Sequence, residues 1–262
     1  MRRALLVLLF LAASLTVARA DFSRAALDAI AADPKPNAQL PLDARFVDAH
    51  GAPRTLGEAI GGKPALVIFA DYTCRTLCGP ILAFAAGGLE KTGLTPGRDY
   101  RLVVVGLDPK DPLATAVAFG DRRLGTDTPL AKAAVMLTGK ADAVRATTEA
   151  AGYRFVYDAQ HDQFAHPAAA YVVTGDGHVA RVLSGLGLDG GDLRLALVDA
   201  GKGAIGGLAD RIHLLCYGFD PAKGIYTASI GRIVSIACAL TVLAMIAGIG
   251  GMIVLRRRSG AT

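Results

Sequence analysis

Residues 65–84 read ALVIFADYTCRTLCGPILAF and join an apolar run to two cysteines, Cys74 and Cys78. A short, continuous apolar run that ends in a turn and a helical pattern predicts a buried strand followed by a helix. Ligands of α/β domains collect at the carboxyl ends of the strands, so the cysteine pair is predicted to lie at a site. Three interpretations are open at this point: a structural disulfide, a redox pair, or two ligands of a soft metal.

Strand-like and helix-like segments alternate on both sides of this stretch. The predicted elements are a hairpin at 45–56, a strand at 64–70, a helix at 80–94, a strand at 100–107, a helix at 112–119, a strand at 134–138, a helix at 140–151, a strand at 153–158, a hairpin at 168–185 and a helix at 192–200. Apolar strands in β-α-β units predict a parallel core, to which the last hairpin adds an antiparallel edge. The sequence therefore predicts a three-layer α/β domain.

The first 20 residues have the pattern of a signal peptide. Arg2 and Arg3 precede an apolar stretch from Ala4 to Val17, and Ala18-Arg19-Ala20 matches a signal-peptidase site. We therefore expect cleavage after Ala20 and export of the domain at 21–201.

A second apolar segment, Ile233–Leu255, contains 23 residues without a charge. At 1.5 Å per residue it is roughly 34 Å long, enough to cross a hydrocarbon core of ~30 Å. We expect a transmembrane helix at 230–255, after a linker and interfacial segment at 202–229. Cys238 in this helix is expected to serve packing or, less often, lipidation, and Cys216 before it is expected to lie at the membrane interface.

Charge sets the expected topology and excludes one class of partner. The tail at 256–262 begins with three arginines, which place it in the cytoplasm by the positive-inside rule. The main domain then faces the periplasm, on a single-pass protein of the inner membrane. The whole chain has 28 basic and 23 acidic residues, but seven of the basic ones belong to the targeting signals. The remaining 21 against 23 gives −2, so the high pI does not indicate nucleic acid binding.

The spacing of the cysteines bears on their chemistry. Residues four apart on a helix have Cβ atoms about 5–6 Å apart, whereas a disulfide needs about 3.8 Å. A disulfide between Cys74 and Cys78 therefore requires a distorted turn, whereas metal–thiolate bonds of roughly 2.3 Å do not. The spacing favours metal ligation and leaves a strained, easily reduced disulfide open.

Histidine is the natural further ligand, and His166 is the best placed of the five. It lies in FAHPAAAYVV, at the mouth of a predicted strand, whereas His50 and His178 lie at predicted turns and His213 precedes the membrane segment. His161 would complete a Cys2His2 zinc pattern, but 82 residues separate the two halves. A domain of this size also does not need a zinc ion in order to fold.

From about Pro41 to Leu186 the sequence resembles the Sco/SenC copper chaperones, thioredoxin-like proteins that help to insert copper into the CuA centre of cytochrome c oxidase. The resemblance rests on Tyr-Thr before the C-x3-C pair, on VVVGLDPKDP, and on a single histidine about 90 residues later that is followed by YVVTGDGHVARVLSG. CRTLCGP with a C-terminal anchor is closest to a branch that usually has Cys-Pro-x-Leu-Cys. Arg75 replaces that proline, and Pro167 follows the histidine.

The resemblance implies a thioredoxin-like domain in which Cys74, Cys78 and His166 bind copper as Cu(I) or Cu(II). The resemblance implies that the client is subunit II of cytochrome c oxidase, with its CuA site. It also implies that the protein is a metallochaperone more than an enzyme. Soft thiolates and a neutral imidazole suit Cu(I). The alternative is a thiol–disulfide oxidoreductase with Cys74 and Cys78 as its redox pair, which would keep client cysteines reduced without a distant imidazole. A peroxidase fits least well, because no peroxide-activating Arg and Thr set is evident.

Overall fold

The computed structural model of the chain describes residues 29–74, 78–159, 162–185, 188–202, 214, 217–220, 225–228, 234–235 and 238–248. The expected signal peptide and cytoplasmic tail lie outside these residues. Of the expected membrane helix at 230–255, the described residues 238–248 are helical. No helix in the described part of the chain is long and apolar enough to cross a membrane.

The centre of the protein is a seven-stranded sheet with the strand order β11-β10-β4-β5-β6-β2-β3. The strands are β2 (Arg45–Asp48), β3 (Pro53–Thr55), β4 (Ala65–Ala70), β5 (Arg101–Gly106), β6 (Val135–Gly139), β10 (Ala169–Val173) and β11 (Val179–Ser184). Strands β4, β5 and β6 are parallel, whereas the β10–β11 and β2–β3 hairpins form antiparallel edges. The parallel core and the antiparallel terminal hairpin confirm the prediction.

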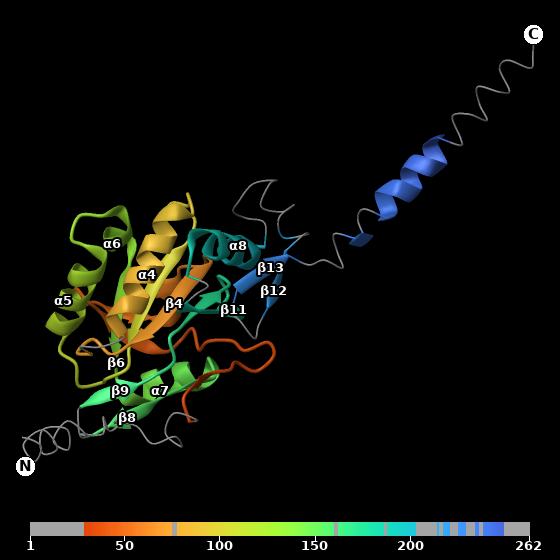
Figure 1. Cartoon of the computed structure of the whole chain (residues 1–262). Helices are drawn as coiled ribbons and strands as arrows, with labels where there is room; N and C mark the ends of the chain where they lie inside the picture. The colour runs from red at the N-terminus through yellow and green to blue at the C-terminus, as the bar shows by residue number, and fades with distance from the viewer. Residues whose placement is uncertain are drawn as a thin grey trace, which may run out of the picture.

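Helices cover both faces of this sheet, as Figure 1 shows. On one face lie α4 (Cys78–Lys91), α5 (Leu113–Leu124), α6 (Pro129–Ala133) and α8 (Gly190–Ala200). On the other face lie α3 (Leu56–Ile60) and α7 (Ala141–Ala150). The predicted three-layer architecture is therefore confirmed, with the short helices α3 and α6 as additions to the expected elements.

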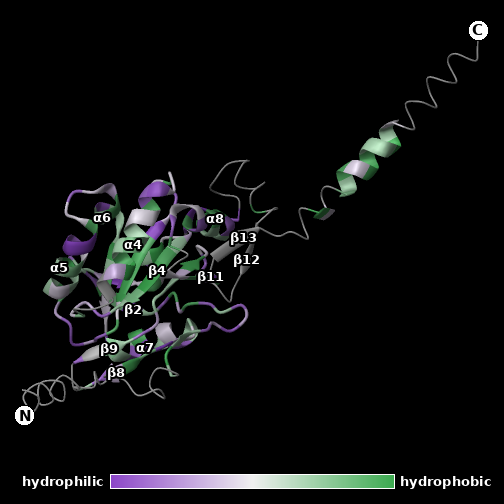
Figure 2. Ribbon diagram, in the orientation of Figure 1, coloured by the Kyte–Doolittle hydropathy of each residue, from purple (hydrophilic) through white to green (hydrophobic). Residues whose placement is uncertain are grey.

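The position of β4 between two helical layers explains why its sequence is apolar at every position. Its alternate side chains enter two separate cores, because successive residues of a strand point to opposite faces. Leu66, Ile68 and Ala70 pack with the helices of the α4 face, and Ala65, Val67 and Phe69 pack on the α3 face. Figure 2 shows β4 in the colour of hydrophobic residues between the two helical layers. All six residues are buried, so neither face of the strand could carry polar side chains.

The strand predicted at 153–158 is two strands. It divides at Phe155 into β7 (Tyr153–Arg154) and β8 (Val156–Asp158), and neither joins the central sheet. Strand β7 pairs with β1 (Ala31–Ala32), and β8 pairs with β9 (Gln163–Ala165). The expected linker at 202–229 contains a further antiparallel pair, β12 (Tyr217–Asp220) and β13 (Ile225–Ala228).

Helix α4, which begins at Cys78, packs closely against the chain that enters α8. A Cβ atom at Gly88 would lie 2.0 Å from the backbone oxygen of Leu188 and 2.6 Å from the Leu193 side chain. At the neighbouring Gly87, no described atom would lie within 4 Å of such a Cβ. The missing side chain at Gly88 therefore sets how near α8 can approach α4.

We expect Gly88→Ala to lower the free energy of unfolding by about 1 to 3 kcal/mol, because the backbone at Leu188 must move to admit the methyl group. Gly87→Ala is the matched control on the same helix, and it should leave stability unchanged or raise it by up to about 1 kcal/mol. Urea unfolding of both variants checks the difference. Equal stability of the two variants would contradict the close approach of α8 to α4.

Candidate metal centre

The loop after β4 holds Cys74 through the side chain of Asp71. The Asp71 carboxylate is fully buried. Its Oδ1 accepts hydrogen bonds from the backbone N–H of Thr73 (2.9 Å), from the Thr73 hydroxyl (2.7 Å) and from the backbone N–H of Cys74 (3.1 Å). Such a side-chain turn fixes the backbone without help from a longer-range partner. Cys74 therefore lies half-buried at the carboxyl end of β4, where the sequence predicts the site.

Tyr72 holds the same loop against the central sheet. Its ring is fully buried, and its hydroxyl lies 3.0 Å from the carbonyl oxygen of Val104 and 2.9 Å from that of Leu137. A Cβ atom at Gly106 would lie 2.7 Å from this ring, so glycine is needed at that position of β5. Burial raises the pKa of Tyr72 well above its ordinary value, and the phenol therefore remains a hydrogen-bond donor to the sheet.

The second oxygen of Asp71 connects this loop to the other half of the predicted site. Oδ2 accepts a hydrogen bond of 3.2 Å from the backbone N–H of Phe164, in β9. Strand β9 ends at Ala165, directly before His166. One buried carboxylate thus joins the loop of Cys74 to the strand that leads to His166, although the two residues lie far apart in the sequence.

His166 is half-buried, and its Nδ1 atom faces two oxygens. Nδ1 lies 2.7 Å from the hydroxyl oxygen of Tyr153 and 3.2 Å from the carbonyl oxygen of Pro167. Burial lowers the pKa of His166 below its ordinary value, although the Pro167 carbonyl and the negative potential of Cys74 and Asp71 act in the opposite direction. The imidazole is therefore neutral at pH 7, which is the form that binds metals. Within the described residues no peptide bond is cis, so the His166–Pro167 bond is trans.

The structure places Cys74 near enough to His166 to influence its pKa, and it places Cys78 as the first residue of α4. The side chain of Cys78, residues 75–77 and His161 lie outside what the structure describes. Among the described side chains, no group of three or more His, Cys, Asp or Glu residues could hold a metal ion. The complete ligand set that includes Cys78 therefore stays a prediction.

The other histidines and cysteines lie elsewhere or outside the described residues. His178 lies in the turn between β10 and β11, and Val173 of β10 pairs with Ala65, at the end of β4 that is remote from Cys74. His50 lies in the β2–β3 turn, so both turn predictions are confirmed. Residues 213 and 216 are not described, and Cys238 is exposed on the helical segment at 238–248.

Two more carboxylates lie near the loop of Cys74. Asp108 is buried, and Asp111 is half-buried in the loop that follows β5. Burial, followed by the charges of Asp108 and Asp71, raises the pKa of Asp111 to about 6, although the Tyr72 backbone N–H donates a hydrogen bond to it. No described group donates to its buried Oδ2 atom. The ammonium group of Lys110, 3.7 Å from Asp108, offsets part of this negative charge.

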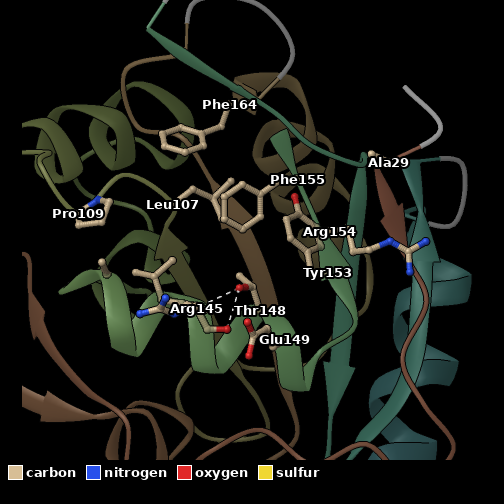
Figure 3. A pocket seen from close by; sticks show the side chains of 12 residues that line it. Ala29, Leu107, Pro109, Arg145, Thr148, Glu149, Tyr153, Arg154, Phe155 and Phe164 are labelled. Atoms are coloured by element: carbon tan, nitrogen blue, oxygen red, sulfur yellow. Dashed lines mark hydrogen bonds between the residues drawn. The ribbon is translucent and has the colours of Figure 1, made fainter. Parts of the chain in front are cut away.

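Aromatic packing holds the hairpin of β8 and β9 that precedes His166. The Phe164 ring packs against Phe155 and Tyr157, with centroids 5.6 and 5.0 Å apart. The ammonium group of Lys110 lies 5.2 Å above the Tyr157 ring and 3.4 Å from Asp162, but these contacts are exposed and contribute little. Figure 3 shows Phe155 and Phe164 on the wall of an apolar pocket of about 520 Å³, with Tyr153 beside them. The histidine side of the site therefore depends mainly on packed rings.

The sequence pattern did not identify Asp71 and Tyr153 as residues of the site. Asp71 had a usable signal, because a charged residue directly follows six buried apolar ones and directly precedes the cysteine loop. Buried polar groups need hydrogen-bond partners, so such a residue is expected to hold a loop. Tyr153 had no local signal, because its partner His166 lies on another segment.

We expect Asp71→Asn to lower the free energy of unfolding by about 1 to 3 kcal/mol, the usual cost of leaving a buried group without its hydrogen bond. Whichever way the amide turns, its NH2 group faces a backbone N–H of Thr73, Cys74 or Phe164. The control is Asp142→Asn at an exposed position on α7, which should stay within about 0.5 kcal/mol of the native protein. Urea unfolding measures both variants. Native stability of Asp71→Asn would exclude the bridging role of this carboxylate.

A model of the SCO1/SenC family matches residues 33–189, more than half of the chain. An Aquifex aeolicus VF5 protein is 23% identical, with 63% of this chain and 94% of that chain covered and a TM-score of 0.56. BsSco, described as a Sco family member with a disulfide switch, is 20% identical, with coverage of 64% and 97% and a TM-score of 0.51. Arabidopsis thaliana ScoI, solved with copper bound, is 15% identical, with coverage of 60% and 94% and a TM-score of 0.50. No curated protein matches the sequence. The mixed α/β architecture is consistent with the thioredoxin-like Sco fold, and the chain belongs to the SCO1/SenC family.

Proposed function

We propose that this protein binds a copper ion through Cys74, Cys78 and His166 and delivers it to the CuA centre in subunit II of cytochrome c oxidase. The observation that carries the proposal is the bridge through Asp71, which joins the loop of Cys74 to the strand before His166. The chemistry of the three proposed ligands fits copper, because soft thiolates and a neutral imidazole are the donors that suit Cu(I). The copper-bound relative from Arabidopsis thaliana has the same fold and supports the choice of metal.

Delivery of the ion by ligand exchange requires donors that a client can reach. Cys74 is half-buried at a loop corner, and His166 is half-buried as well, so neither is enclosed in the core. Copper binding also requires both thiols to be reduced. In a compartment that oxidises thiols, the redox state of the pair would therefore decide whether the protein can hold its cargo.

A thiol–disulfide oxidoreductase is the second candidate, and one observation favours it. Cys78 is the first residue of α4, where the helix dipole stabilises a thiolate. The same placement supports metal binding, since the thiolate is also the ligand form. The two functions differ in their need for His166, which disulfide exchange does not use.

We expect His166→Ala to lower the Cu(I) affinity of the reduced full-length protein by more than the roughly 10- to 100-fold typical of changes outside the ligand set. The reason is the loss of the nitrogen donor while both thiols remain. Competition with a Cu(I) chelator in detergent solution measures the affinity, and exchange with a small disulfide measures the thiol chemistry, which should survive.

His178→Ala is the matched control, because His178 lies at the far end of the sheet, and it should bind Cu(I) like the native protein. Native Cu(I) affinity of the His166→Ala variant, together with loss of function in Cys74→Ala, would assign the protein to the oxidoreductases instead.

We infer a single membrane crossing near the C-terminus, which would hold the domain close to a membrane-embedded client. Its support is the run Ile233–Leu255, free of charges, followed by three arginines. In this topology the signal peptide at 1–20 is removed, the domain at 21–201 and the segment at 202–229 are periplasmic, and the tail at 256–262 is cytoplasmic.

A reporter fused after Thr262 tests this topology. A reporter that is active only in the cytoplasm should give signal, and one that is active only in the periplasm should not, because the arginines retain the tail inside. The same reporters fused after Lys202 are the control and should show the reverse pattern. Periplasmic activity at Thr262 would rule out the proposed anchor.

A further inference from the structure

The pocket in Figure 3 opens beside Ala29, the first residue that the structure describes. Its volume is about 520 Å³, and Ala29 is one of its lining residues. Figure 3 shows Ala29 at the margin of the pocket, on the side of Tyr153 and Arg154. Asp28 is joined to Ala29 by one peptide bond, so their Cα atoms are about 3.8 Å apart. The chain that precedes Ala29 therefore begins at the wall of the pocket.

Strand β1 fixes the direction from which this chain arrives. It pairs antiparallel with β7, so that Ala31 lies opposite Arg154 and Ala32 lies opposite Tyr153. In an antiparallel pair, a step backward on one strand is a step forward on its partner. A step back from Ala31 therefore leads toward Phe155, which lines the pocket. The register directs the preceding chain along the pocket and not away from it.

The walls of the pocket are apolar and partly exposed. Leu107 and Val144 are buried, whereas the rings of Phe155 and Phe164 are only half-buried. All four belong to the core on the α3 face or pack against it. Covering apolar surface is favourable by roughly 25 cal/mol per Å². The pocket is thus an open extension of the core that an apolar segment can complete.

Charged side chains accompany these apolar walls, namely Arg145, Glu149 and Arg154. All three are exposed, and Arg145 also contacts Asp142 on its own helix. Two of the three lining charges are positive. Complementary charges favour a covering segment in which acidic residues outnumber basic ones.

Residues 21–28 read DFSRAALD and have this composition. Phe22 and Leu27 are large apolar residues, and the segment carries two acids and one base against the two bases and one acid of the pocket. Phe22 is seven residues before Ala29, a span of roughly 25 Å for an extended chain and roughly 10 Å for a helix. Because the segment is tethered at the pocket, its effective concentration there exceeds that of a separate partner.

We propose that residues 21–28 dock in this pocket, with Phe22 and Leu27 as the side chains that cover its apolar walls. The pocket wall includes Phe164, whose backbone N–H donates to Asp71, so the docked segment stabilises the hairpin that precedes His166. The inference rests neither on copper binding nor on signal-peptide cleavage, because residues 21–28 remain in the chain after cleavage following Ala20.

The test places the photo-reactive analogue benzoylphenylalanine at position 22 of the full-length protein in detergent solution. After irradiation and digestion, mass spectrometry identifies the linked peptides. A mixture of unlabelled and 15N-labelled chains distinguishes a link within one chain from a link between two copies. The matched control carries the analogue at Phe84, which is 63% exposed on α4, on the opposite face of the sheet.

Position 22 should link within one chain to α7, to β7 or to the β8–β9 hairpin, and position 84 should not. Links between two copies would assign the pocket to a second copy and overturn the inference. Links from position 22 that miss the pocket, or no links at all, would overturn it as well.

Hydrogen exchange gives a second readout without a probe. The double variant Phe22→Ser, Leu27→Ser should exchange the amides of α7 and of the β8–β9 hairpin about 10-fold faster than the native protein, because lost apolar contacts make local opening easier. Ser23→Ala is the control in the same segment and should exchange like the native protein. Native exchange rates in the double variant would contradict the docking.

Discussion

The site depends on one buried carboxylate, that of Asp71, because a charged group without water must satisfy its oxygens with protein donors. Four donors do so: two on Thr73, one on Cys74 and one on Phe164. The first three shape the cysteine loop, and the fourth fixes the distance from this loop to β9. Any displacement of either segment exposes part of the carboxylate to an apolar surrounding. The two halves of the site are therefore held in register by the cost of leaving a charge unsatisfied.

The two sides of the site are held by different kinds of contact. On the cysteine side, Tyr72 reaches carbonyl groups of two strands, and its ring fills the space that Gly106 leaves open. On the histidine side, the β8–β9 hairpin lies outside the central sheet and is held by ring packing, an exposed ion pair and the hydrogen bond from Phe164 to Asp71. Buried hydrogen bonds to the sheet therefore hold the cysteine side, whereas the histidine side depends more on contacts between side chains.

Much of the fold could be predicted, because the strands of a parallel core are buried on both faces and their sequences are continuously apolar. The break at Phe155 could not, because the residues 153–158 satisfy a strand pattern whether or not the strand bends. Helix α6 had a signal in Thr128 and Pro129, an N-cap followed by a proline at the first helical position, but it is only five residues long. The position of Cys74 just past the carboxyl end of β4 was also predicted. The contact of Tyr153 with His166 could not be predicted, because it depends on where two separate segments meet.

The position of β4 in the sheet has a consequence for the order of folding. Its neighbour β5 follows it closely in the chain, but its other neighbour, β10, pairs Ala170 with Ile68, about 100 residues away. Contacts of such large sequence separation close long loops and therefore form late, which is typical of domains with high contact order. A chain that is still incomplete would expose its cysteines well before the imidazole could reach them. The cysteine thiols and the imidazole therefore come together only in the complete domain, and an incomplete chain has the thiols without the imidazole.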